Sequence, residues 1–107
     1  MSKTIRNHVV MVLALSMAGA FSFAQSGAAI YKAKCQSCHG ATGMADTPVA
    51  KVMKVKPITD PSVTKMSEAE MIKATEDGMG KMQPFKGKIS DAQIKEAVLY
   101  FRSHMKK

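Results

Sequence analysis

The chain has 107 residues, enough for one small domain, and its 16 lysines and arginines outnumber eight acidic residues, which gives a formal charge of +8. A basic balance can indicate nucleic acid binding, but no nucleic-acid-binding motif is present and an apparent export signal argues against that function. No alternation of apolar and polar residues predicts a strand, and no repeat or low-complexity tract occurs. The predicted elements are therefore helices and loops.

Residues 1–24 have the pattern of a secretory signal peptide. Two basic residues precede an apolar run at 9–20, and Ser22-Phe23-Ala24 places small residues where a signal peptidase needs them. The run is shorter than the roughly 20 residues of a membrane-spanning helix. We expect cleavage before Gln25, to within a few residues, and export to the periplasm without stable membrane insertion. The mature domain would be residues 25–107.

The first helix of that domain is predicted from Ser26, a capping residue, to Cys38. It ends in the motif Cys35-Gln36-Ser37-Cys38-His39, followed by glycine. C-x-x-C-H is the attachment signature of c-type haem. Thiols three residues apart lie about one helical turn from each other, so Cys35 and Cys38 can both form thioethers with one porphyrin, and His39 can be the proximal iron ligand.

Three other interpretations of the two cysteines are weaker. A thioredoxin-like dithiol would follow a strand, whereas residues 28–34 favour a helix. A structural zinc ion usually takes four Cys or His ligands, and outside the motif the chain offers only His8 and His104. A disulfide between Cys35 and Cys38 would close too short a loop to constrain the unfolded chain much.

Capping signals predict a short second helix. Thr47-Pro48 places a capping residue before a proline at the first helical position. The apolar residues on one of its faces are Val49, Val52 and Met53. The helix should end before Pro57, because a residue that precedes proline avoids helical backbone. Residues 57–61 are expected to be extended, with a turn.

Two capping boxes predict the remaining helices. Residues 67–70 combine serine with glutamate three positions later, and this helix should run to Asp77 and stop at Gly78. Residues 78–84 are too rich in glycine and proline for regular structure. Residues 90–93 repeat the capping box with glutamine. The apolar residues that follow at helical spacing are Ile94, Ala97, Val98, Phe101 and Met105.

The second iron ligand would decide what the haem does. Ten methionines make any single one unremarkable. Those in or beside predicted helices favour core packing: Met53, Met66, Met71 and Met105. Met82 differs because it lies in the irregular loop between two helices, with Gly80 before it and Pro84 after it. Met79 is the alternative, ahead of Lys81 and His104, and we expect His104 on the solvated end of the last helix.

These residues resemble the class I c-type cytochromes. The shared features are Gly27 and Tyr31 in the first helix, Cys35 to Gly40, Gly80 to Phe85, and Tyr100. The resemblance implies an all-α cytochrome c fold of three to four short helices around one covalent haem c. It also implies that the first and last helices cross, so that Gly27 and Tyr31 meet Ala97 and Tyr100.

The chain departs from the family pattern at two places. Proline follows Met82 only after Gln83. The proline that accepts a hydrogen bond from the proximal histidine is open between Pro48 and Pro57.

Ligation by His39 and Met82 predicts electron transfer and not an enzyme. The iron would be six-coordinate, the thioether sulfur would favour the ferrous state, and the haem would cycle between Fe(III) and Fe(II). Lysines in the segments expected near the haem edge suggest redox partners with acidic docking faces, although a merely solvated basic surface is the alternative. These lysines are Lys51, Lys54, Lys56, Lys81, Lys86 and Lys88.

Two other functions stay open. A five-coordinate haem would bind gases or reduce peroxide, but the His and Arg residues available in the expected mature chain for that chemistry are few: beyond His39, only Arg102 and His104 late in the last helix. The chain could also be a haem subunit of a larger oxidase or dehydrogenase. The sequence does not name the electron donor or acceptor, the reduction potential or the oligomeric state.

Overall fold

The computed structural model describes residues 26–106, and this range is helical without a strand. Its elements are α2 (Gly27–Lys34), α3 (Gln36–His39), α4 (Pro48–Met53), α5 (Pro61–Thr64), α6 (Glu68–Asp77), α7 (Asp91–Ser103) and a 3-10 turn (His104–Lys106). The predicted all-α class is confirmed. Within residues 26–106 no helix has the length and apolar character needed to cross a bilayer. The predicted signal peptide lies outside the described residues.

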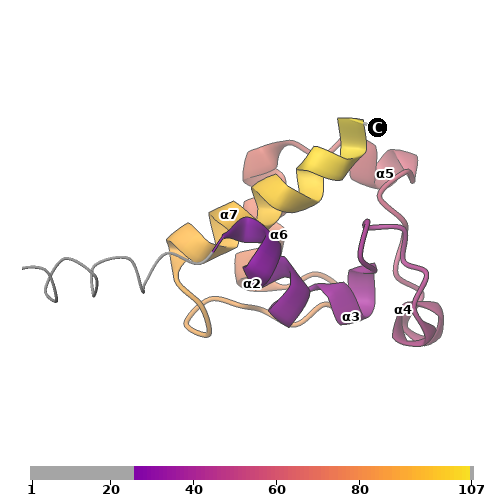
Figure 1. Ribbon diagram of the computed structural model, residues 1–107, viewed down its shortest axis with the longest axis horizontal. Helices are drawn as coiled ribbons and strands as arrows, with labels where there is room; N and C mark the ends of the chain where they lie inside the picture. Colours follow the sequence, from indigo (N-terminus) through magenta and orange to yellow (C-terminus); the bar gives the residue numbers. More distant parts are fainter. Residues whose placement is uncertain (1–25, 107) are drawn as a thin grey trace, which may run out of the picture.

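The first and last helices of this range cross closely, as predicted (Figure 1). Gly27 lies at the crossing, where a Cβ would collide with the backbone carbonyl of Glu96 and come within 3.3 Å of Cβ of Tyr100. Any larger residue would push α2 away from α7. One turn further along, the ring of Tyr31 lies 5.3 Å from that of Tyr100. The two helices therefore form one packed unit.

The hydrophobic core lies between α6 and α7 and under the loop that joins them. Its buried cluster is Met71, Phe85, Ile94 and Val98. Partly buried residues pack against it, among them Met66, Met82, Phe101 and Met105. Core packing is thus confirmed for Met66, Met71 and Met105, while Met53 is half-buried on α4. Ile94 is completely buried, so α7 is the helix around which the core is built.

Local capping chemistry sets most of the helix ends. The side chains of Ser26, Thr47, Ser67 and Ser90 each accept a backbone N–H in the first turn of α2, α4, α6 and α7. At Ser90 the return bond from Gln93 completes the predicted capping box. At Ser67 only the serine half forms within residues 26–106. The α6 helix stops at Gly78, as predicted.

The first predicted helix is divided into two. The backbone departs from helical geometry at Cys35, where φ is −119°, so α2 ends at Lys34 and α3 begins at Gln36. The N–H groups of Cys38 and His39 both donate to the carbonyl of Cys35, at 3.2 and 3.0 Å. The motif therefore forms its own helical turn rather than the last turn of a longer helix.

The α5 helix was not predicted. Asp60-Pro61 resembles Thr47-Pro48, and Asp60 caps α5 by accepting from the backbone N–H of Ser62 at 2.9 Å. An extended residue before proline fits both a turn and a helix N-cap, so the sequence pattern alone did not separate the two.

The expectation for His104 was wrong. Its ring is half-buried, it lies edge-on to Tyr100 at 4.9 Å, and its Nε2 is enclosed without a hydrogen-bond partner among residues 26–106. The helical chain tightens into a 3-10 turn at His104 rather than fraying, and this turn holds the imidazole against the preceding turn of α7.

Candidate haem site

The turn of residues 35–39 brings three of the four predicted ligands together. Cys35 joins α2 to α3, and Cys38 and His39 lie on α3. Both cysteines are unpaired and half-buried, so no disulfide competes for their thiols. Burial, with a smaller contribution from Cys38, raises the pKa of the Cys35 thiol to about 11. Two adjacent free thiols followed by an imidazole are the donor set that covalent haem attachment needs.

The His39 ring is held by packing. It meets Phe101 edge-on, with ring centroids 5.4 Å apart. Burial lowers the pKa of His39, so the imidazole is neutral at pH 7, the form that binds iron. Its Nδ1 is enclosed and has no hydrogen-bond partner among residues 26–106. Neither Pro48 nor Pro57 therefore supplies the expected carbonyl partner in this structure.

Side chains from α2 and α7 hold this turn in place. The Tyr31 hydroxyl donates to the carbonyl of Gly40, at the end of the motif, at 2.5 Å and in a buried position. Phe101 stacks on Tyr31 at 6.1 Å and also contacts His39. Phe101 is the residue whose role the sequence analysis missed. Its helical spacing indicated burial, but nothing in the spacing indicated contact with the histidine.

The loop that carries Met82 is closed at its base. The N–H groups of Phe85 and Lys86 donate to two carbonyls in the last turn of α6, those of Thr75 and Glu76, at 2.9 and 3.2 Å. Phe85 anchors the far end, because its side chain is 7% exposed within the core cluster. The loop is therefore fixed to the core at both ends.

A two-residue hairpin forms the tip of this loop. Met79 and Met82 exchange backbone hydrogen bonds of 3.1 and 2.9 Å across Gly80 and Lys81. Gly80 has a φ of +58° and the φ of Lys81 is not positive, a combination typical of a type II′ turn. Met82 is half-buried against the core cluster, whereas Met79 is 60% exposed. The structure thus distinguishes the two candidate methionines, and it fixes Met82 more firmly.

The histidine and methionine segments meet through Phe101. Phe101 packs against the same core cluster as Met82, and its ring contacts His39. The donor set comes from the junction of α2 and α3, from α3 itself and from the loop before α7, and Phe101 of α7 links its histidine to the cluster on which its methionine packs. The arrangement fits a haem held between a histidine and a thioether.

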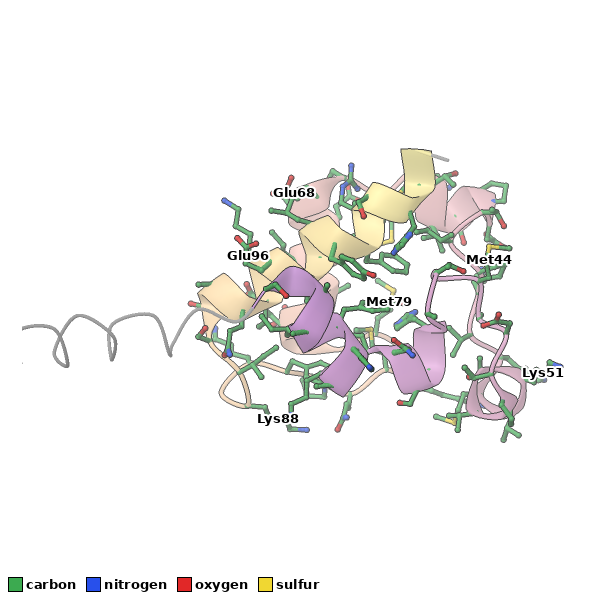
Figure 2. All side chains as sticks on the ribbon, viewed as in Figure 1. Met44, Lys51, Glu68, Met79, Lys88 and Glu96 are labelled. Atoms are coloured by element: carbon green, nitrogen blue, oxygen red, sulfur yellow. The ribbon has the colours of Figure 1, made fainter. Side chains whose placement is uncertain are left out.

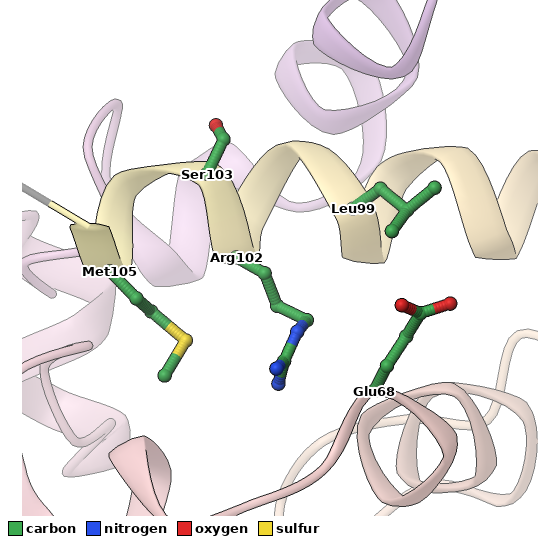
Figure 3. Close-up of a pocket in the computed structure, with 5 residues that line it drawn as sticks. All are labelled: Glu68, Leu99, Arg102, Ser103 and Met105. Atoms are coloured by element: carbon green, nitrogen blue, oxygen red, sulfur yellow. The ribbon is translucent and has the colours of Figure 1, made fainter.

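A separate groove lies between the start of α6 and the end of α7 (Figure 3). It has a volume of about 460 Å³ and is lined by Glu68, Leu99, Arg102, Ser103 and Met105. Arg102 fixes this region by donating from Nη1 to the carbonyl of Met66 at 2.8 Å. None of the four predicted haem residues lines the groove, so it is not the haem site.

Comparisons with known proteins identify the family and the fold. A family model described as "Cytochrome C oxidase, cbb3-type, subunit III" matches residues 22–101. A cytochrome c6 of Leptolyngbya boryana is 32% identical over 77 residues, which is 72% of this chain and 87% of that protein. The solved structure of the KustC0563 c-type cytochrome is 26% identical, with a TM-score of 0.67, over 75% of this chain and 98% of that chain.

The chain therefore belongs to the c-type cytochromes. Its cofactor is a single covalently bound haem c, and it is an electron carrier. The predicted family, fold and cofactor are confirmed.

Proposed function

We propose that Cys35 and Cys38 bind the haem through thioethers, and that His39 and Met82 are its axial ligands. The haem supplies an iron that cycles between Fe(III) and Fe(II). The observation that carries the proposal is the turn in which the Cys35 carbonyl accepts from both Cys38 and His39, because it fixes two free thiols and the imidazole on one side of a single helical turn.

Each residue has a distinct task. His39 would bind the iron as a neutral imidazole, and Phe101 restrains the rotation of its ring. The hairpin holds both backbones, and Met82 is favoured over Met79 because its side chain packs on the core cluster whereas that of Met79 is 60% exposed. Bound to the iron, the Met82 thioether would exclude oxygen and peroxide and would raise the reduction potential.

We further propose that residues 1–24 are removed on export and that residues 25–107 act in the periplasm. The carrier would exchange electrons with redox proteins whose docking faces are acidic. The support is electrostatic, because the sequence carries twice as many basic as acidic residues and the one ion pair among residues 26–106 joins Lys73 to Asp77. Most lysines therefore keep their charge available to a partner.

Optical spectra of purified holoprotein test these assignments. We expect the colour to remain with the protein in acid-acetone, and the oxidised form to show the weak long-wavelength sulfur-to-iron charge-transfer band. Haem released into the organic layer would contradict covalent attachment through Cys35 and Cys38. Ready binding of carbon monoxide by the reduced protein would mean an open sixth position, and would favour gas binding or peroxide reduction.

A second candidate function is that of a haem subunit in a larger enzyme. The description of the matching family names an oxidase subunit, and this observation favours it. Mild detergent extraction followed by native electrophoresis separates the two cases. A free carrier migrates alone, whereas a subunit migrates with a membrane complex.

A further inference from the structure

The outward face of α4 has a composition that its place in the fold does not explain. Ala50 is the buried residue of this helix, whereas Val49 is 45% exposed and Val52 is 76% exposed. Pro48 is also exposed and lies on the same side, because residues three and four apart share a helix face. The predicted apolar face of this helix therefore points largely to solvent. Exposed apolar groups with a polar rim are typical of interaction sites.

Uncompensated positive charge surrounds this face. No acidic residue stands between Asp46 and Asp60, and the same segment carries Lys51, Lys54 and Lys56. The ammonium group of Lys56 donates to Ser62 at 3.2 Å. Within residues 26–106, Lys51 and Lys54 have neither an ion pair nor a side-chain hydrogen bond, and both are exposed. Figure 2 shows Lys51 at the outer end of α4, directed away from the other helices.

Lys54 occupies a backbone position that normally belongs to glycine. It ends α4 in the left-handed region, with φ of 56° and ψ of 43°, and its N–H bonds back to α4 while Val55 donates to the carbonyl of Ala50 at 2.9 Å. Helices that end in this way usually have glycine there, because a Cβ is unfavourable in left-handed backbone. Strain of this kind is typical of functional sites. The lysine costs stability and places a charge beside the apolar face.

The α4 helix is tied directly to the haem-binding turn. The Thr47 hydroxyl caps α4 by accepting from Ala50 at 3.0 Å, and it donates to the carbonyl of Ser37 at 2.7 Å. Ser37 lies between the two cysteines. A partner seated on α4 would therefore lie beside the segment that carries the haem, as electron transfer requires.

We propose that Pro48, Val49 and Val52, with Lys51 and Lys54 at their rim, form the docking surface for the protein that exchanges electrons with this cytochrome. We name this set the α4 face. Its partner has an apolar centre and an acidic rim. The inference rests on the proposed function and specifies where its partner binds.

The size of the α4 face favours a protein over a lipid surface. Transient redox complexes use small interfaces, and opposite charges at their rims speed association. A helix of six residues with three exposed apolar side chains offers little area for insertion into a bilayer.

Steady-state oxidation of the reduced holoprotein by a cell-envelope extract of the organism that makes it tests the proposal. The paired change Lys51→Glu and Lys54→Glu should raise KM about tenfold at low ionic strength, and the difference should shrink as salt screens the charges. Val52→Ser should raise KM about threefold at every salt concentration, since its contribution is apolar. The visible spectrum and the reduction potential should stay those of the wild type.

Lys65→Glu with Lys95→Glu is the matched control. It makes the same change in net charge at exposed positions outside α4, so KM should change less than twofold. An equal rise in KM in this control would mean that net charge alone governs the rate, and would overturn the proposal.

The Lys54→Gly variant tests whether Lys54 serves docking or the stability of the fold. Glycine relieves the left-handed strain, so the melting temperature should be unchanged or higher while KM rises about threefold. A lysine that served the fold would give the opposite result, a lower melting temperature with a normal KM.

The remaining outcomes also decide the question. Wild-type KM in the α4 variants, with an intact spectrum, overturns the docking surface and leaves the proposed function standing. An extract that leaves the wild-type protein reduced contradicts electron transfer in the envelope, and with it the docking surface. Co-flotation of the wild type with phosphatidylglycerol vesicles, lost on Lys51→Glu with Lys54→Glu, would assign the α4 face to lipid instead.

Discussion

The two sides of the proposed haem site are built in different ways. The cysteine and histidine side is local, because five consecutive residues fold into one turn through hydrogen bonds to the Cys35 carbonyl. The methionine side depends on distant contacts: the loop of residues 78–84 is closed by Phe85 and Lys86 against the end of α6, and Met82 packs on the core. A short motif can specify the first side completely, whereas the second exists only when α6 and α7 are packed.

The largest expected effect is the loss of haem binding when the cysteine and histidine side is changed. Cys35→Ala or Cys38→Ala should sharply reduce the yield of holoprotein, because each removes one thioether. His39→Ala should keep the covalent bonds but lose the proximal ligand. Haem content per polypeptide, measured by absorbance after purification, checks the two cysteine variants, and the ligand-sensitive bands of the visible spectrum check His39→Ala.

Ser37→Ala is the control for these changes. Ser37 is exposed and lies between the cysteines, and its carbonyl remains available to Thr47 after the substitution. We expect a full yield of holoprotein. A loss as large as that of the cysteine variants would mean that the turn itself, rather than its thiols, limits attachment.

The next largest effect concerns the methionine side of the site and tests which methionine binds the iron. Met82→Ala should abolish the sulfur-to-iron band, lower the reduction potential and open the iron to carbon monoxide. Met79→Ala should change none of these, because Met79 is 60% exposed and packs little. Loss of the band in the Met79 variant alone would reassign the ligand while leaving electron transfer in place.

Sequence reasoning succeeded where the determining interactions are local. The starts of α6 and α7 follow from their serine caps, and the end of α6 follows from Gly78. The same reasoning did not find that His104 is buried, since a position near a helix end resembles a frayed one until the 3-10 turn places it on Tyr100. Nor could it show that Phe101 contacts His39, because that contact requires α7 to be packed against α2 and α3.

The same limit applies to the choice of methionine. Met79 and Met82 lie three residues apart in a loop that is rich in glycine, and either could be directed inward on sequence grounds. Their difference in burial arises from packing against residues of α6 and α7. Whether Met82 binds the iron stays a prediction that the preceding variants test.

Substitution of two glycines in the methionine loop should have a smaller effect, and it tests how the position of Met82 is fixed. Gly78 has a φ of +81° and a ψ of 164°, and an added Cβ would lie 2.8 Å from the Met82 carbonyl oxygen. Gly80 has a φ of +58°, and nothing lies within 4 Å of an added Cβ. Gly80→Ala should cost about 2 kcal/mol from backbone strain. Gly78→Ala should cost more, since strain and collision add.

Denaturant titrations followed by the sulfur-to-iron band measure this difference. Gly78→Ala should weaken the band in the native state, because the collision displaces the backbone of Met82 itself. Gly80→Ala should lower stability and leave the native band intact. Equal effects on the band would mean that the loop shifts as a unit, and that the Gly78 contact does not position Met82.

The smallest effect is expected at the start of α7. Ser90 accepts from the N–H of Gln93 at 3.1 Å, and Ser90→Ala removes that cap at a cost of about 1 kcal/mol. For a domain of this size the melting temperature should fall by about 5 °C. Because α7 begins directly after the methionine loop, fraying of its first turn should loosen Met82 before it reaches the Cys35–His39 turn. On heating, the sulfur-to-iron band should therefore be lost before the helical circular dichroism signal, with a wider gap than in the wild type. An unchanged melting temperature would mean that α7 is held by its packing on α2 and α6, and not by its cap.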